Sequence, residues 1–231
     1  MNPDPSAFLH LLQFADGLFP AGGYAHSFGL ETLVQSGRVQ TADDVATFLR
    51  AHLQNSAAPT DAVIALAARK AALAHDLPTC LRLDQMIEAL KIAAESREAS
   101  HQMGRQTLRI LRDLSPDPFI TRFAAEAESQ AAPCHHAVVF GIASAALNWP
   151  PEETASAFLY SASALIVGAS LRLLPLGQLA GQRILWSLVP LIASLARAVQ
   201  EKTEDDISSF TPEIEMAAMR HESLDARMFR S

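Results

Sequence analysis

The chain contains little cysteine, tyrosine or tryptophan, with two of each in 231 residues. Cys80 and Cys134 alone cannot build the disulfide framework of a small secreted domain. Aromatic residues make up only 6% of the chain, and the residue types that favour strands are correspondingly sparse. The sequence also lacks a Walker-type phosphate loop, a GxGxxG fingerprint, an HExxH pair and a GxSxG elbow. These absences exclude a disulfide-rich secreted fold and argue against the commonest nucleotide-binding and hydrolase classes.

The chain also has fewer basic than acidic residues. It contains 18 Lys and Arg and 25 Asp and Glu, which gives a formal net charge of −7. This balance argues against an extended nucleic-acid surface. Nothing near the N-terminus resembles a signal peptide. Residues 157–174 are apolar, but three serines and Arg172 interrupt them, so a buried helix is favoured over a membrane span. We expect a cytoplasmic protein that binds neither nucleic acid nor membrane.

Helical periodicity recurs along nearly the whole chain, and no segment shows sustained period-two alternation. Thr41 and Thr60 are candidate N-caps, and Gly37 suits the residue that follows a helix. A kink is expected near residues 100–104, and Pro190 should kink or break the helix that contains it. The sequence predicts an all-α fold, a single helical-bundle domain of about ten helices with a C-terminal docking tail. The expected helices span residues 5–15, 28–35, 41–55, 60–74, 81–114, 117–130, 135–148, 152–173 and 178–202.

The last residues differ in character from the rest of the chain. An acidic, polar segment at 201–209 predicts a hinge between a bundle at residues 1–203 and a C-terminal partner-binding helix and tail at 204–231. The tail helix should begin around Pro212 and Glu213. Large apolar residues alternate with charged ones here, a mixture typical of a docking segment rather than a disordered tail. The residues concerned are Met216, Met219, Arg220, His221, Glu222, Leu224, Arg227, Met228, Phe229 and Arg230.

Cys134, His135 and His136 are the best metal candidates in the sequence, because thiolate and imidazole bind Ni²⁺, Cu and Zn²⁺. Neighbours at a helix start point about 100° apart, so all three cannot reach one ion. Ligands from elsewhere, or from a second chain, would be needed to complete a site. The alternative, which we favour, is a buried cysteine beside two capping or interface histidines.

Other polar residues have less specific explanations. Arg105, Arg109 and Arg112 are spaced at i, i+4 and i+7 and so form one basic stripe on a helix. The stripe is either a solvated face or a docking surface for an acidic protein. A third interpretation is that it supplies an arginine side chain to a nucleotide bound by a partner.

Arg172 lies in an apolar stretch, so its charge must be paired or must face a partner. The turn that follows accounts for Pro175 and Gly177, but not for the presence of Arg172 and Gln178. His26, Ser27 and Glu31 invite a hydrolase interpretation, but adjacent Ser and His seldom reach triad geometry.

Five blocks in order resemble the urease accessory protein UreF family. They are LLQFAD at 11–16 with FPAGGYAHSFGLE at 19–31, ESREAS at 95–100 with Gln102 and Gly104, HHAVVFG at 135–141, LRLLPLGQ at 171–178, and MRHE at 219–222 leading to RMFRS at 227–231. Leu174 stands where this family often has a smaller residue. Each block alone is weak, and their order makes the resemblance strong.

The resemblance implies an all-α, non-catalytic urease maturation factor without a cofactor. It implies a homodimer that binds UreD/UreH and recruits the GTPase UreG, so that nickel is inserted into apo-urease. By the same resemblance the tail at 220–231 would order against UreD/UreH, with Arg172 and Gln178 nearby. His26, Ser27, Glu31 and the arginine stripe would belong to a UreG-facing or dimer surface. Two alternatives stay open: a nickel-binding chaperone using Cys134, His135 or His136, and a modulator of GTP hydrolysis by UreG.

Overall fold

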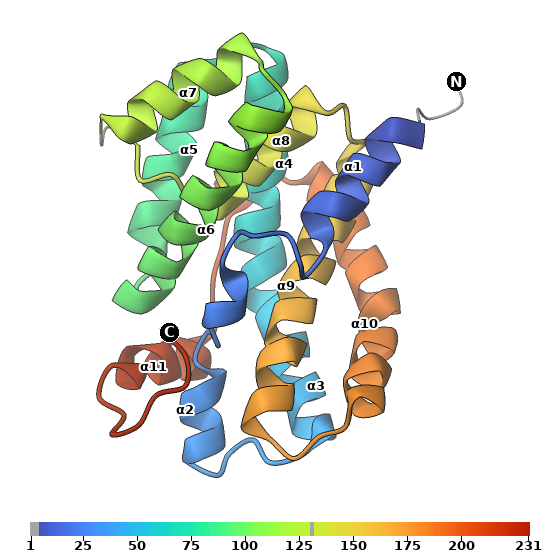
Figure 1. The fold of residues 1–231 in the computed structure, drawn as a ribbon, viewed down its shortest axis with the longest axis vertical. Coiled ribbons are helices and arrows are strands. Elements are labelled where there is room, and N and C mark those ends of the chain that lie inside the picture. Colours follow the sequence, from blue (N-terminus) through green and yellow to red (C-terminus); the bar gives the residue numbers. More distant parts are fainter. Residues whose placement is uncertain (1–4, 130–131) are drawn as a thin grey trace.

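The computed structural model describes residues 5–129 and 132–231. Within these residues the fold is entirely helical and contains no strand, which confirms the all-α prediction (Figure 1). The α-helices are α1 (Pro5–Ala15), α2 (Leu30–Gln35), α3 (Ala42–His52), α4 (Val63–Leu73), α5 (Leu77–Leu90), α6 (Ala94–Leu114), α7 (Pro118–Glu128), α8 (His136–Ala146), α9 (Pro151–Leu173), α10 (Gln178–Ala198) and α11 (Pro212–His221). A π-helix, η2 (Leu53–Ala62), and the short 3-10 helices η1 (Gly23–Ala25), η3 (Val199–Glu201) and η4 (Glu204–Asp206) complete them.

Local sequence signals set several of these boundaries. Thr41 caps α3 through a capping box, in which Asp44 N donates to Thr41 Oγ1 and Thr41 N donates to Asp44 Oδ2. Gly37 follows α2 with a φ of 71°, a left-handed conformation that glycine adopts without strain. Asp117 caps α7 ahead of Pro118 at the first helical position. The predictions for Thr41 and Gly37 are therefore confirmed.

Thr60 does not start a helix, because α3, η2 and α4 follow one another without a break. The wider π-helical turns of η2 contain Pro59, whose missing N–H would disrupt an α-helical ladder. The Thr60 hydroxyl instead donates to the carbonyl of Ser208, at 2.7 Å. The cap prediction was wrong because this hydroxyl bonds to a segment almost 150 residues later in the chain.

The long helix predicted at 81–114 is two helices, which separate at residues 91–93 rather than kinking near residue 100. The guanidinium of Arg97 donates to the carbonyls of Lys91 and Ile92, at 2.8 and 2.9 Å, and so stabilises the turn between them. Pro190 likewise lies within α10, which continues past it to Ala198. Hydrophobic periodicity alone does not reveal the break at residues 91–93, because side-chain to backbone bonds such as those of Arg97 leave no mark on the periodicity.

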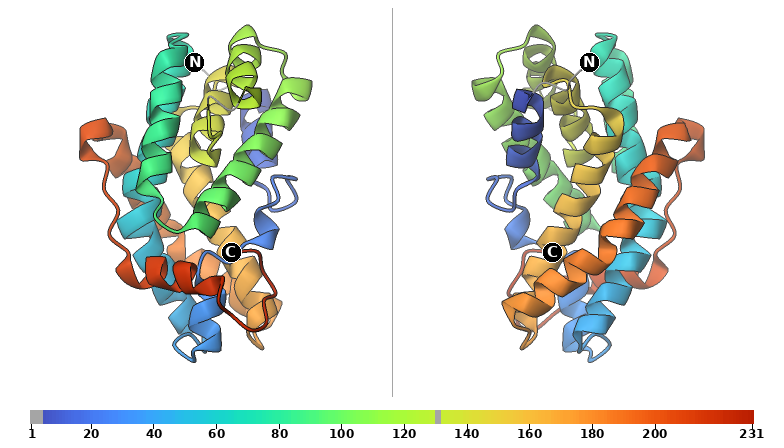
Figure 2. Two further views of the ribbon diagram at one scale, coloured as in Figure 1. Left: turned by 90° about the vertical axis from the view of Figure 1, so that its left-hand side faces the viewer. Right: turned by 90° about the vertical axis from the view of Figure 1, so that its right-hand side faces the viewer.

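Helix α8 lies at the centre of the bundle, packed against α4, α6 and α9. Gly141 allows α8 to approach α4 closely, since a Cβ at this position would lie 2.2 Å from the carbonyl oxygen of Ala65 on α4. Helices α9 and α10 run side by side along one flank (Figures 1 and 2). Both are long and apolar enough to cross a membrane by length and composition alone, a test that core helices also pass, and half of the apolar window of α9 is buried.

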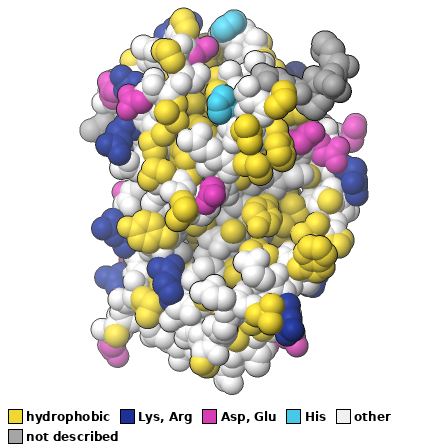
Figure 3. All heavy atoms as spheres, turned by 45° about the vertical axis from the view of Figure 1, so that its right-hand side comes forward, with side chains coloured by type: hydrophobic (Ala, Val, Ile, Leu, Met, Phe, Trp, Pro, Cys, Tyr) yellow, Lys and Arg dark blue, Asp and Glu magenta, His cyan; other side chains and the backbone are white. Residues whose placement is uncertain are grey.

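Large apolar side chains reach the surface on several helices, and the face in Figure 3 shows many of them. Phe8 and Leu9 on α1 are 56% and 61% exposed, and Trp186 on α10 is 81% exposed. Single exposed apolar residues are ordinary in soluble proteins, whereas groups of them mark contact surfaces.

Candidate functional site: the C-terminal tail and its docking cluster

The C-terminal residues 212–231, called the tail below, fold back onto the bundle. Helix α11 packs against α2 and α6, and the residues after it return to the start of α2 (Figures 1 and 2). Backbone bonds fix the last two residues: Arg230 N donates to Ala25 O at 2.8 Å, and Ser27 N donates to Ser231 O at 2.5 Å. The Ser27 hydroxyl donates to the same oxygen at 2.8 Å. The tail is thus tied to the segment between η1 and α2, about 200 residues away in sequence.

Glu31 is the centre of the contacts under the tail, and it is only 2% exposed. One carboxylate oxygen accepts from Met228 N at 2.7 Å, and the other accepts from Phe229 N at 3.1 Å. The second oxygen also lies 2.8 Å from His221 Nε2. Burial by itself would raise the pKa of Glu31, but the hydrogen bonds from Met228, His221 and Phe229 outweigh it and lower that pKa. The tail therefore surrounds an ionised carboxylate with donors.

His221 is fully buried between two carboxylates. Its Nε2 faces Glu31 and its Nδ1 lies 2.7 Å from Glu95 Oε2 on α6. The His221 ring therefore bridges two carboxylates that lie on different helices. Arg227 donates to the other oxygen of Glu95 at 3.0 Å. We call Glu31, Glu95, His221 and Arg227 the docking cluster, which joins α2, α6 and the tail through charge-assisted hydrogen bonds.

Arg172, at the end of α9, also contacts the tail. Its guanidinium lies 4.2 Å from the centre of the Phe229 ring, within the range of a cation–π interaction. It also donates to Tyr24 O at 2.6 Å. Phe229 is buried, so Arg172 covers an aromatic anchor of the tail. Gln178 lies farther along the chain, exposed at the first residue of α10.

The tail residues divide into an inward and an outward set. Ala217, Ala218, His221, Phe229 and Ser231 are buried against the bundle. The outward set, which we call the outer tail face, is exposed; it comprises Met216, Met219, Arg220, Glu222, Arg227, Met228 and Arg230. Of the predicted tail residues, His221 and Phe229 are thus anchors to the protein's own body, Leu224 is half-buried, and the others are exposed, although Arg227 also pairs with Glu95.

His26 and Ser27 belong to the tail contacts as well. His26 Nδ1 lies 2.8 Å from Ser231 Oγ, and burial, reinforced by Arg230, lowers the pKa of His26 to about 4. Since the Ser27 hydroxyl donates to Ser231 O, it is not paired with His26 as a nucleophile would be. Together with Glu31, these residues form the floor on which the tail rests.

The arginine stripe lies on α6, away from these contacts. Arg105, Arg109 and Arg112 are all exposed, and Arg112 pairs with Glu128 on α7. An exposed pair of this kind contributes little to stability, typically about 0–1 kcal/mol. The structure therefore presents Arg105 and Arg109 as a solvated basic face.

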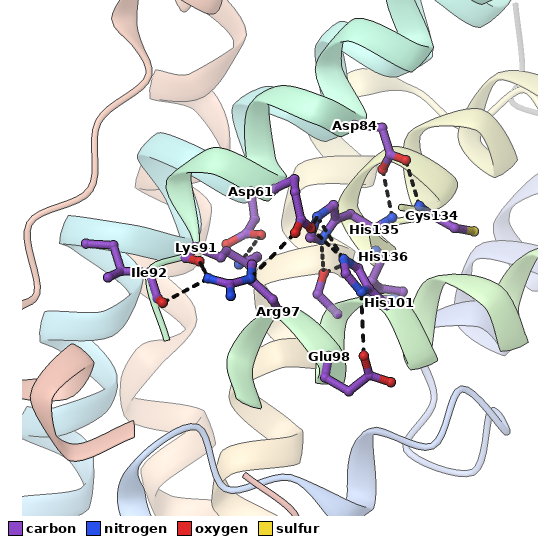
Figure 4. A network of polar contacts seen from close by, with 12 residues as sticks. Asp61, Asp84, Lys91, Ile92, Arg97, Glu98, His101, Cys134, His135 and His136 are labelled. Atoms are coloured by element: carbon purple, nitrogen blue, oxygen red, sulfur yellow. Dashed lines mark hydrogen bonds and ion pairs between the residues drawn. The ribbon is translucent and has the colours of Figure 1, made fainter. Parts of the chain in front are cut away.

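The Cys134–His136 segment leads into α8, and its three side chains are held in different surroundings. Asp84, on α5, accepts from Cys134 N and His135 N at 2.6 and 2.7 Å (Figure 4). Burial raises the pKa of Asp84 to about 6 and that of the Cys134 thiol to about 12.

Burial also lowers the pKa of His135 to about 2 and that of His136 to about 4, so both rings are neutral near pH 7. The His136 ring packs against Phe140 and Phe158 and lines a pocket, whereas His135 faces Glu88. The structure therefore does not bring the three side chains to one point.

Sequence spacing does not link several residues that the structure brings together. Glu95, the second partner of His221, is 126 positions away from it, and Glu88 and His101 lie 47 and 34 positions from His135. No motif spacing links such residues, so only the packing of α5, α6 and α8 reveals them.

Together these features define an all-α protein whose own C-terminal segment closes over a buried ionic cluster. Comparison with known proteins then gives its family. The UreF family profile matches residues 39–189. The chain is 33% identical to the urease accessory protein UreF of Nostoc sp. over 97% of its length and 96% of the relative. It is 29% identical to the UreF of Bacillus sp. over 96% of its length and 98% of that protein, and 33% identical to that of Actinobacillus pleuropneumoniae over 96% and 97%. The chain belongs to the UreF family of urease accessory proteins, and its role is in urease maturation.

Proposed function

We propose that this protein is a non-catalytic scaffold of the cytoplasm that binds UreD/UreH and recruits the GTPase UreG, so that nickel is inserted into apo-urease. Membership of the UreF family supports a role in urease maturation. The outer tail face is the observation that supports binding to UreD/UreH. Methionine and arginine are enriched at the centres of protein interfaces, and here they project from a segment whose other side is anchored. Nucleotide hydrolysis and nickel are then supplied by partners, and this chain supplies surface.

The anchoring has an energetic consequence for binding. A free segment loses conformational entropy when a partner orders it, which weakens association. The docking cluster holds the outer tail face in place beforehand, so less of that entropy is lost on binding. We expect Glu31, Glu95 and His221, the members of the cluster that lie beneath the tail, to contribute to affinity without touching the partner.

Co-purification tests the proposal in its simplest form. The chain is expressed with its own UreD/UreH and UreG homologues, and the product is sized by light scattering. We expect a complex with two copies of this chain, and we expect deletion of residues 220–231 to abolish capture of UreD/UreH while circular dichroism stays helical. Full capture by the shortened chain, or a monomer that ignores both partners, would sink the scaffold proposal.

A role in modulating GTP hydrolysis is favoured by one observation, the exposure of Arg105 and Arg109 beside the paired Arg112. An arginine supplied to a nucleotide must be free to move into a partner's site. Single substitutions Arg105→Ala and Arg109→Ala should then reduce hydrolysis by UreG in the complex, with Arg112→Ala as the control. If all three variants leave GTP hydrolysis by UreG at the wild-type rate, this second function is excluded.

A further inference from the structure

Three potential metal ligands meet where α5, α6 and the start of α8 come together. Glu88 is near the end of α5, His101 is on α6, and His135 immediately precedes α8. His101 Nε2 lies 2.7 Å from Glu88 Oε2, His135 Nε2 lies 2.9 Å from the same oxygen, and the two nitrogens are 3.3 Å apart. The three atoms converge on one point, and Figure 4 shows the two histidines facing each other within this network.

The spacing of these atoms fits a small divalent ion. An ion bound tetrahedrally at 2.0–2.1 Å has neighbouring ligands about 3.3 Å apart. The separation of the two nitrogens already has this value, and the carboxylate oxygen needs to withdraw from them by about half an ångström. Imidazole and carboxylate ligands suit zinc, nickel and cobalt.

Surrounding groups hold the ligands in position. His135 Nδ1 lies 3.0 Å from Ser100 Oγ, and Asp84 accepts the backbone N–H of His135. His101 Nδ1 faces Glu98 at 3.7 Å. Outer partners of this kind fix the ring orientation and leave Nε2 as the ligand atom. Glu88 Oε1 faces Arg97 at 3.6 Å, so Oε2 is the oxygen left for an ion.

One carboxylate oxygen and two imidazole nitrogens form a ligand set of the kind that holds a divalent transition-metal ion. The site is also accessible, because His101 is 14% exposed and Glu88 35% exposed while His135 closes the floor.

We propose that Glu88, His101 and His135 bind one divalent transition-metal ion per chain through Glu88 Oε2 and the two Nε2 atoms, leaving a coordination position open. Cys134 and His136 take no part, because Cys134 is held beside Asp84 and the His136 ring packs on phenylalanines. The site is formed within one chain and does not depend on the scaffold function, so it is testable on the isolated protein.

The test is isothermal titration of the tag-free, chelator-treated full chain with Zn²⁺ and, separately, with Ni²⁺. We expect one ion per chain in the wild type and loss of that site in His101→Ala and in Glu88→Gln. Ser100→Ala, which removes an outer partner, should weaken binding by about tenfold. The control His10→Ala removes an exposed histidine of α1 and should leave binding unchanged.

Circular dichroism establishes that each variant is folded, and the accessible His101 and Glu88 are preferred for substitution over the fully buried His135. A cobalt titration adds a direct signature, since Co²⁺ in a tetrahedral site of this kind absorbs visible light and His101→Ala should abolish the band. No stoichiometric binding by the wild type would overturn the proposal and leave a hydrogen-bonded cluster. Binding that persists in both His101→Ala and Glu88→Gln, or that is lost in a His136→Ala variant, would also overturn it.

Discussion

Replacement of Glu31 by glutamine should release the tail from the bundle. The carboxylate accepts from two backbone N–H groups and from His221, and it is almost completely buried. Glutamine has nearly the same shape, but one of its two terminal groups is an NH₂ donor. In either orientation of the amide, a donor then faces the N–H of Met228 or of Phe229.

The size of the effect follows from these contacts. A hydrogen bond to a charged group contributes about 1.5–3 kcal/mol, and a buried donor left without an acceptor costs about 1–3 kcal/mol. The two effects overlap, so we expect a loss of about 3 kcal/mol in the free energy of tail docking. Such a loss shifts the equilibrium between docked and free tail by about two orders of magnitude.

Hydrogen exchange measured by mass spectrometry reports this equilibrium directly. Peptides covering residues 225–231 should exchange much faster in Glu31→Gln, while peptides from α4 and α8 keep their protection. Glu222→Gln makes the same chemical change at an exposed tail position and serves as the control. Unchanged protection of the tail in Glu31→Gln would refute the account of the docking cluster.

Further predictions concern stability. Gly104→Ala should destabilise the fold by about 3 kcal/mol or more, because the new Cβ would lie 1.9 Å from the carbonyl oxygen of Cys134. Gly168→Ala should instead stabilise the fold by up to about 1 kcal/mol, because Gly168 lies within α9 and its new Cβ would meet no atom within 4 Å. Urea unfolding of the two variants measures both changes. Burial lowers the pKa of His26 and of His52 to about 4, whereas in the unfolded chain both pKa values are near 6.5. As the pH falls, the unfolded chain therefore takes up these two protons at a higher pH than the folded chain does. The free energy of unfolding should therefore fall as pH drops from 6.5 towards 4, by up to about 1.4 kcal/mol per pH unit for each histidine, and His26→Gln should flatten this slope. Arg172→Lys should speed hydrogen exchange in the tail, because a compact ammonium replaces the planar guanidinium that lies over the Phe229 ring. Equal exchange rates in this variant and in the wild type would contradict that role of Arg172.

Much of the fold follows from local sequence. The capping box at Thr41, the glycine at 37 and the proline-led start of α11 at 212 each act within a few residues, and all three appear where local rules place them. The failures at residues 60 and 91–93 have a different origin. At residue 60 the Thr60 hydroxyl bonds to Ser208, far away in the sequence. At residues 91–93 the chain turns between two helices, where the Arg97 guanidinium donates to the carbonyls of Lys91 and Ile92, and hydrophobic periodicity carries no signal for such side-chain bonds.

The tail shows the same division between local and distant information. Its mixture of methionine, arginine and phenylalanine marks a docking segment, but not which side chains face inward. That assignment depends on Glu31 and Glu95, which lie on helices distant in sequence. The ligand cluster of Glu88, His101 and His135 is a stronger example, because only one of its three members stood out in the sequence.

The affinity of the outer tail face for UreD/UreH tests the central claim most directly. We would titrate the purified UreD/UreH homologue with the wild-type chain and with a Met219→Ala, Arg220→Ala, Met228→Ala variant, whose changes are all exposed. Leu73→Ala, at an exposed apolar position on α4, is the control. The account predicts that the triple variant keeps a protected, docked tail and yet loses most of its affinity, while the control binds like the wild type. Wild-type affinity in the triple variant would contradict it.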